Sequence, residues 1–124
     1  MERTFEDLET RLERFAITGV LVTEKMPNTT AGRFYAVQLL RASGSATLNY
    51  AESQGGASHR DFSNKIKIVF KEMRESRMAL RIIHGANLHP DLPWVLSVTQ
   101  EASELVAIMA ASVRTAEQRS ARKN

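Results

Sequence analysis

The chain has 124 residues, the usual size of one domain, which is enough to bury one hydrophobic core. Because it contains no cysteine, disulfides, thiolate metal sites and cysteine nucleophiles are excluded, and no apolar run approaches the roughly 20 residues that span a bilayer. With 17 Lys and Arg residues against 14 Asp and Glu residues, the net charge of +3 says little about partners. We expect one soluble, cytoplasmic domain over residues 1–124 that is not inserted in a membrane.

Helical patterns occupy four stretches, which are separated by prolines and by a glycine pair at Gly55 and Gly56. The predicted helices span residues 5–25, 30–54, 59–87 and 94–118, and residues 119–124 form a basic tail that we expect to fray. Short links between amphipathic helices favour antiparallel neighbours. The predicted fold is therefore an all-α, antiparallel up-down four-helix bundle.

The first predicted helix carries more apolar surface than one core face needs. Spacings of three and four place on one face Phe5, Leu8, Leu12, Phe15, Gly19 and Val22. The segment FAITGVLV is apolar nearly all round, and periodicity favours a helix there although β-branched residues also suit a strand. The excess apolar surface requires a second neighbour, either inside the bundle or in another subunit.

The second predicted helix has two apolar faces, one that contains Leu39 and Ala46 and one that contains Val37, Leu40 and Leu48. A polar stripe runs between them. If both faces are packed, the polar groups of the stripe must satisfy one another. We therefore expect a buried structural network, and not a catalytic cluster, that consists of Gln38, Arg41, Ser45, Asn49, Glu52, Asp61 and Lys65.

The third predicted helix has a well-marked start and a basic side. Ser58 is expected to cap it, with Asp61 completing a capping box. Apolar residues recur from Phe62 to Ile83, and basic residues lie opposite to them. This basic side is either a solvated surface or a nucleic-acid contact made by Lys67, Lys71, Arg74 and Arg81.

The fourth predicted helix follows Pro93. Its basic tail would contribute secondarily through Arg119, Arg122 and Lys123.

The segment QLLRASGSATLNYAESQGGASHRDFSNKIKIVFKEMRESRMALRII resembles the four-helix-bundle family of ribosomal-RNA intervening-sequence proteins. The residues that carry the resemblance are Gln38, Leu39, Arg41, Ser45, Asn49, Glu52, Ser58, Asp61, Phe62, Lys65, Glu72 and Glu75. The resemblance implies a homopentamer of bundles packed around an axis. It also implies kinship with the accessory protein of diversity-generating retroelements, a basic pentamer that binds a reverse transcriptase and its template RNA.

These observations favour a non-enzymatic, oligomeric basic scaffold that binds RNA, DNA or a nucleic-acid enzyme such as a reverse transcriptase. One alternative is a purely structural, self-assembling bundle without nucleic acid. Another is a ribonuclease, because the spacing of Arg77 and His84 resembles the Arg-X4-6-His motif of the all-helical HEPN ribonucleases. No phosphate loop, metal motif or nucleophile elbow is present in the sequence, so we expect no cofactor and no metal.

Overall fold

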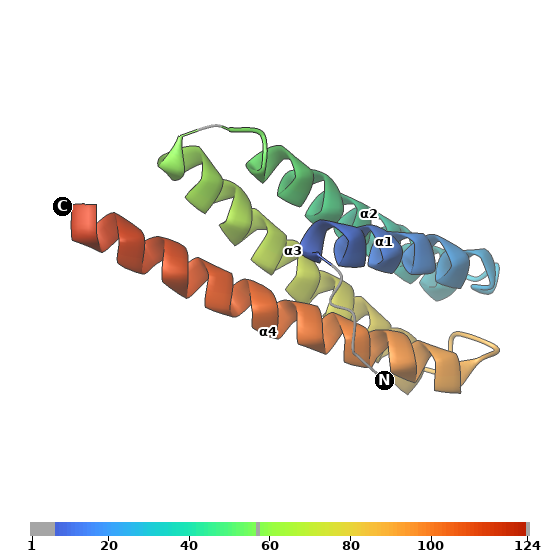
Figure 1. The fold of residues 1–124 in the computed structure, drawn as a ribbon. Coiled ribbons are helices and arrows are strands. Elements are labelled where there is room, and N and C mark those ends of the chain that lie inside the picture. The colour runs from blue at the N-terminus through green and yellow to red at the C-terminus, as the bar shows by residue number, and fades with distance from the viewer. Residues whose placement is uncertain (1–6, 57, 124) are drawn as a thin grey trace, which may run out of the picture.

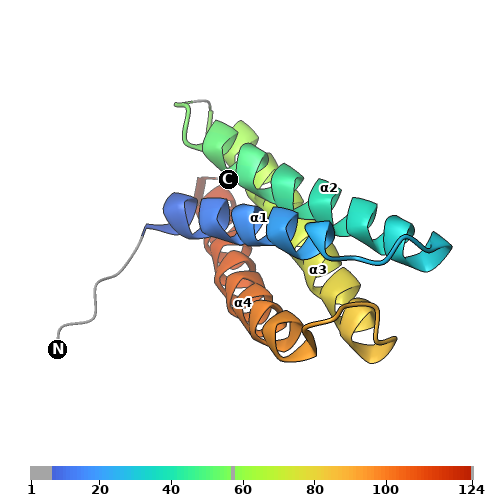
Figure 2. The same cartoon turned by 90° about the vertical axis from the view of Figure 1, so that its right-hand side faces the viewer.

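The computed structural model describes residues 7–56 and 58–123, except for the side chain of Lys123. Four helices form an antiparallel up-down bundle (Figure 1), which confirms the predicted fold class. Their bounds are α1 Leu8–Glu24, α2 Thr30–Ser53, α3 His59–Gly85 and α4 Leu92–Lys123. The described residues contain no strand. Figure 2, a view from the side, shows α1 and α2 crossing α3 and α4 at an angle.

The neighbours of each helix follow the order of the chain. Helix α2 packs on α1 and α3, while α4 packs on α3 and, less extensively, on α1. Among the described residues, no Cα atom of α1 lies within 8 Å of one in α3, so the two helices lie diagonally opposite each other across the core. This arrangement leaves the outer sides of the α1–α2 pair and of the α3–α4 pair facing different directions.

The ends of α4 differ from the prediction. It begins at Leu92, two residues before the predicted start, and continues to Lys123, whereas residues 119–124 were predicted to fray. Ala116 is buried, and the ring Nε2 of His59 lies 3.0 Å from Ser120 Oγ. Because these contacts attach the last turns to the start of α3, residues 119–123 continue α4, and residue 124 lies outside the described residues.

Capping side chains define the helix starts. Thr29 Oγ1 accepts a hydrogen bond from Gly32 N at 3.0 Å, and Ser58 Oγ accepts one from Asp61 N at 3.2 Å, as the sequence predicted for α3. Asp7 caps α1 through Thr10 N at 2.8 Å. This backbone hydrogen bond lowers the pKa of Asp7 below its ordinary value.

The reversal between α3 and α4 is built on Asn87, which adopts the left-handed conformation with φ 56°. Leu88 N donates to Ile83 O at 3.0 Å and Asn87 N donates to His84 O at 3.1 Å. This pair of bonds is a Schellman motif, and asparagine tolerates its left-handed position better than most residues do. The motif fixes the C-terminal turn of α3, on which His84 lies.

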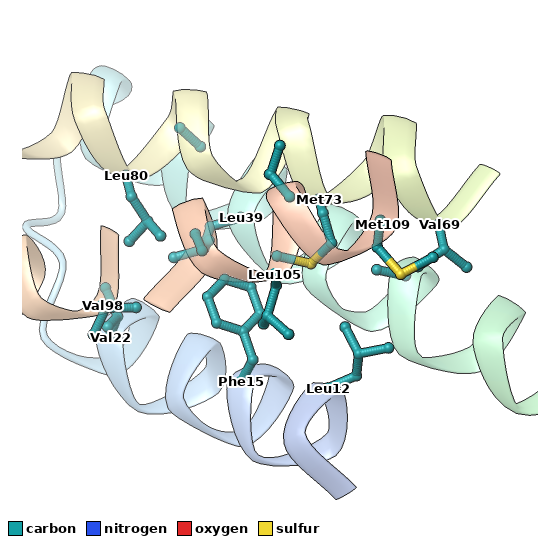
Figure 3. Close-up of a cluster of buried hydrophobic side chains, with 14 of the residues drawn as sticks. Leu12, Phe15, Val22, Leu39, Val69, Met73, Leu80, Val98, Leu105 and Met109 are labelled. Carbon is teal, nitrogen blue, oxygen red and sulfur yellow. The ribbon is translucent and has the colours of Figure 1, made fainter. Parts of the chain in front are cut away.

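The core lies between all four helices (Figure 3), and its large side chains are almost completely excluded from solvent. Each such side chain contributes about 1.5–3 kcal/mol on burial. The buried cluster includes Leu12, Phe15, Val22, Leu39, Ala46, Ile66, Val69, Met73, Leu80, Ile83, Val95, Val98, Ala102, Leu105 and Met109. These residues are the periodic apolar positions of the predicted helices, so the core follows from the sequence pattern.

Candidate functional site

The polar stripe of α2 lies beside α3, but it is not one buried network. Its best-connected member is Arg41, whose Nη1 donates to Glu72 Oε2 at 3.1 Å and whose Nη2 donates to Glu75 Oε2 at 2.9 Å. Gln38 Oε1 accepts a further bond from Arg41 Nη2 at 3.3 Å. The hydrogen bond to Glu75, more than any other interaction, raises the pKa of Arg41 above its ordinary value.

The other stripe residues form separate local pairs. Asn49 Nδ2 donates to the backbone oxygen of Ser45 at 2.9 Å, and Lys65 Nζ donates to Glu52 Oε2 at 2.6 Å. Asp61 is exposed in the first turn of α3, where its backbone N donates to Ser58 Oγ. The predicted burial is wrong, since the Glu52 side chain is 60% exposed. The second apolar face of α2 is uncovered within one chain, so the stripe next to it reaches solvent.

A second arginine cluster joins α1 to α4 and was not predicted. Arg11 Nε and Nη2 donate to the two carboxylate oxygens of Glu101 at 2.8 and 2.7 Å, and Nη2 also lies 3.2 Å from Glu104 Oε1. The hydrogen bonds to Glu101 raise the pKa of Arg11 above its ordinary value. These partners lie about ninety positions apart in the sequence, so no local spacing could have indicated the contact.

The four basic residues predicted on α3 lie on the outer surface of that helix and form a basic ridge, defined as Lys67, Lys71, Arg74 and Arg81. Each is exposed, and none forms an ion pair within the described part of the chain. The guanidinium of Arg74 lies 5.6 Å from the centre of the Phe70 ring, a cation–π distance that holds it against the helix. In α4, Arg119 and Arg122 are exposed, and the Lys123 side chain lies outside the described residues.

An open groove of about 500 Å³ separates the C-terminal half of α3 from the N-terminal half of α4. We call it the α3–α4 groove, and it is lined by Arg77, Arg81, His84, Leu96, Thr99 and Ser103. Arg81 belongs both to this groove and to the basic ridge. The structure therefore places Arg77 and His84 in one groove. The Arg-X4-6-His spacing alone does not predict which residues of α4 line the groove with them.

Two histidines outside the α3–α4 groove have structural roles. His59 is the first residue of α3 and contacts Ser120. His89 is 4% exposed, its Nδ1 accepts a hydrogen bond from Asp91 N at 3.0 Å, and its ring packs edge-on to Trp94 with centroids 5.6 Å apart. Both contacts hold the ends of α3 and α4 together, so these histidines are not assigned to a binding site.

A wide apolar surface lies uncovered on the outer side of α1 and α2. We call it the α1–α2 apolar face, and its large side chains are 42–67% exposed: Ile17, Val20, Leu21, Val37, Leu40 and Leu48. The two helices approach closely beneath it, because Thr47 Oγ1 donates to Leu12 O at 3.0 Å and Gly19 lies against Ser43. These are the excess apolar positions that the sequence indicated.

Within residues 7–56 and 58–123, no group of three or more His, Cys, Asp or Glu residues is placed to hold a metal ion. None of the four helices is long and apolar enough, over its described residues, to cross a membrane.

Comparison with known proteins supports the fold and leaves the family open. No family model matches the chain, and no curated protein matches it. A solved structure that is similar to it is a protein of unknown function from the S23 ribosomal protein family of Bacteroides thetaiotaomicron. The TM-score is 0.74 at 21% sequence identity, over 86% of this chain and 98% of that protein. At this identity the likeness shows the fold alone.

Proposed function

We propose that the chain is a non-enzymatic, self-assembling basic scaffold that binds nucleic-acid backbone through the basic ridge of α3. The family resemblance further implies that the assembly is a pentamer and that the partner is a reverse transcriptase or its RNA. The proposal has two parts, binding and assembly, and each part rests on a different surface of the molecule.

The observation that carries the binding part is the contrast between paired and unpaired cations. Arg11 and Arg41, at the helix interfaces, each meet two carboxylates. Within the described residues, the basic ridge has no such neutralisation. An uncompensated row of exposed cations attracts a polyanion, because binding releases the counterions condensed on its phosphates.

The dimensions of the ridge fit a strand. Lys67 and Arg81 are fourteen residues apart on one helix, about 21 Å at 1.5 Å per residue. Phosphates of one helical strand recur about every 3.4 Å along the axis, so the ridge spans about six of them. Tyr35, Tyr50 and Trp94 are partly buried against the core, and burial raises the pKa of Tyr50. Since these rings are not free to stack on bases, binding should be electrostatic and tolerant of sequence.

The assembly part rests on the α1–α2 apolar face. A group of large apolar side chains that are 42–67% exposed on two neighbouring helices is typical of a protein–protein interface, and a second copy of the chain offers a matching apolar surface. The basic ridge lies on α3, diagonally opposite α1, so assembly through the apolar face leaves the ridge accessible. Repetition of the ridge in an oligomer strengthens the local positive field.

Fluorescence anisotropy with labelled single-stranded RNA at several salt concentrations tests binding. The triple variant Lys67→Gln, Lys71→Gln, Arg74→Gln should weaken binding similarly for unrelated sequences and flatten the log–log salt slope by about 2, since each phosphate contributes about 0.7. Because the triple variant removes three charges, the single variant Lys71→Gln is also measured and compared with Lys25→Gln, which removes one charge from an exposed site outside α3. If the triple variant, still assembled, binds as tightly as the wild type, the ridge is only solvated.

Light scattering tests assembly. The wild type should have the mass of several chains of 13.9 kDa, and Val37→Glu with Leu48→Glu should return it to one chain. Ile68→Glu is the control, because it places a glutamate at an exposed apolar site on α3, away from the α1–α2 apolar face. A monomeric wild type contradicts the scaffold, whereas an oligomer without RNA affinity supports the purely structural alternative.

A further inference from the structure

We infer that the α3–α4 groove is a binding site for one nucleotide phosphate, in which Arg77, Arg81 and His84 bind the anion and α4 holds the attached nucleoside. The inference deepens the proposed function, because it places a defined anchor at one end of the basic ridge. The phosphate belongs to a nucleic-acid strand or to a free nucleotide, and the chemistry that recognises it is the same in both cases.

The charge of the groove calls for an anion. No carboxylate is among its lining residues, and neither Arg77 nor Arg81 has an ion pair within the described chain. Arg77 is also partly buried, like Arg11, which meets two carboxylates. A guanidinium offers five N–H donors, and a phosphate can accept two of them side by side.

Helical spacing directs the three cationic or basic side chains into the same groove. Arg77, Arg81 and His84 are separated by four and three residues, so they lie on one side of α3 in successive turns. The Schellman motif at Asn87 fixes the turn that carries His84. The site is therefore built on regular helix and a defined cap, which fix the backbone positions of the three residues before any ligand binds.

The side of the groove formed by α4 adds groups that suit a nucleoside. Thr99 Oγ1 already donates to Val95 O at 2.8 Å, so its free lone pairs can only accept, as from a sugar hydroxyl. The Ser103 hydroxyl has no partner among the described residues and can donate to the phosphate. Leu96 is 46% exposed and offers an apolar wall to a sugar or a base. The volume of about 500 Å³ lies in the range of small-ligand sites.

The test is a titration of isotope-labelled full-length protein, followed by NMR at the arginine Nε–H groups and the histidine rings. The probes are inorganic phosphate, AMP and a single-stranded RNA oligonucleotide. We expect AMP and RNA to shift the signals of Arg77 and His84, while His59 and His89 serve as internal references that stay unchanged. Inorganic phosphate should produce the same pattern at higher concentration, since it lacks the nucleoside. If neither AMP nor RNA shifts the groove signals, the inference is wrong.

A groove variant provides the second measurement. Arg77→Gln with His84→Gln should lower affinity for AMP and RNA by about tenfold or more, because hydrogen bonds to charged groups are the strong ones. Arg60→Gln, which removes an exposed cation at the opposite end of α3 and outside both the ridge and the groove, should leave AMP affinity unchanged. Unaltered AMP affinity in the groove variant would overturn the inference. The wild-type titration decides the matter if this variant does not fold.

The outcomes separate this inference from the proposed function. RNA binding that depends on the ridge, with silent groove signals, contradicts the nucleotide site and leaves the scaffold standing. AMP binding in the groove without any RNA binding supports the site, assigns a free nucleotide as its ligand, and contradicts the scaffold. Binding of both, with both sets of variants impaired, supports the two together.

Discussion

Replacing Arg41 by alanine should destabilise the protein several times more than replacing Glu52 by alanine, although both residues belong to the polar stripe of α2. Arg41 bonds to Glu72, whose side chain is only 7% exposed, and to Glu75. Glu52 bonds to Lys65 alone, and these two side chains are 60% and 36% exposed. Arg41→Ala therefore leaves a buried carboxylate without its cation. Glu52→Ala only removes one member of an exposed ion pair.

The magnitude follows from this difference in burial. Breaking a fully buried ion pair costs about 3–5 kcal/mol. Because the Arg41 side chain is 49% exposed, water can reach the carboxylates when the guanidinium is removed, so we expect about 1–3 kcal/mol, the cost of an unsatisfied buried group. For Glu52→Ala the expected loss is about 0–1 kcal/mol, as for other exposed pairs. In a chain of this size about 2 kcal/mol corresponds to about 6–12 °C in Tm.

Thermal unfolding followed by circular dichroism measures both variants at one protein concentration, since Tm depends on concentration in an oligomer. The pKa of Arg41 is raised in the folded state, so its stabilisation is fully present below the ordinary pKa of arginine and is lost only as the pH rises through the higher folded value. The difference between the variants should therefore hold from neutral pH to moderate alkali. Equal losses for Arg41→Ala and Glu52→Ala would refute the reasoning from burial.

Three further outcomes are expected. Gly32→Ala should lower Tm although alanine favours helices, because the new Cβ would lie 2.2 Å from Pro27 O. Gly85→Ala should not lower Tm, because no atom lies within 4 Å of the new Cβ. Asp7→Ala should lower Tm at neutral pH, and the difference should narrow as the pH falls below 3.8, because the pKa of Asp7 is lowered and its stabilisation is lost on protonation. Labelled RNA should stay intact on a denaturing gel with both the wild type and His84→Ala, while cleavage by the wild type alone would establish the ribonuclease alternative.

The sequence predicted the helices and the core because both depend on periodicity along one chain. Alternation of three and four residues identified Leu12 and Val22 as core positions, and they are fully buried. Periodicity could not decide whether the second apolar face of α2 is covered within the monomer. The predicted burial of the polar stripe depended on that point, which is why Glu52 was placed in an interior that it does not occupy.

The surfaces between helices were less predictable because they depend on how the helices are rotated about their axes. The basic ridge follows from spacing within α3 alone, and its exposure could be predicted. The α3–α4 groove combines Arg81 with Ser103, more than twenty positions away, and only packing brings the two helices together. The pairing of Arg11 with Glu101 is of the same kind.

The unequal lengths of the helices imply that the two ends of the bundle open at different rates. Helix α1, of 17 residues, begins beside Glu104, whereas α4 has 32 residues and continues well past that point (Figure 1). Beyond Met109 the side chains of α4 that pack inward are few, chiefly Val113 and Ala116. Amide hydrogens of residues 110–123 should therefore exchange with solvent well before those of residues 95–109, through local openings that leave the core closed.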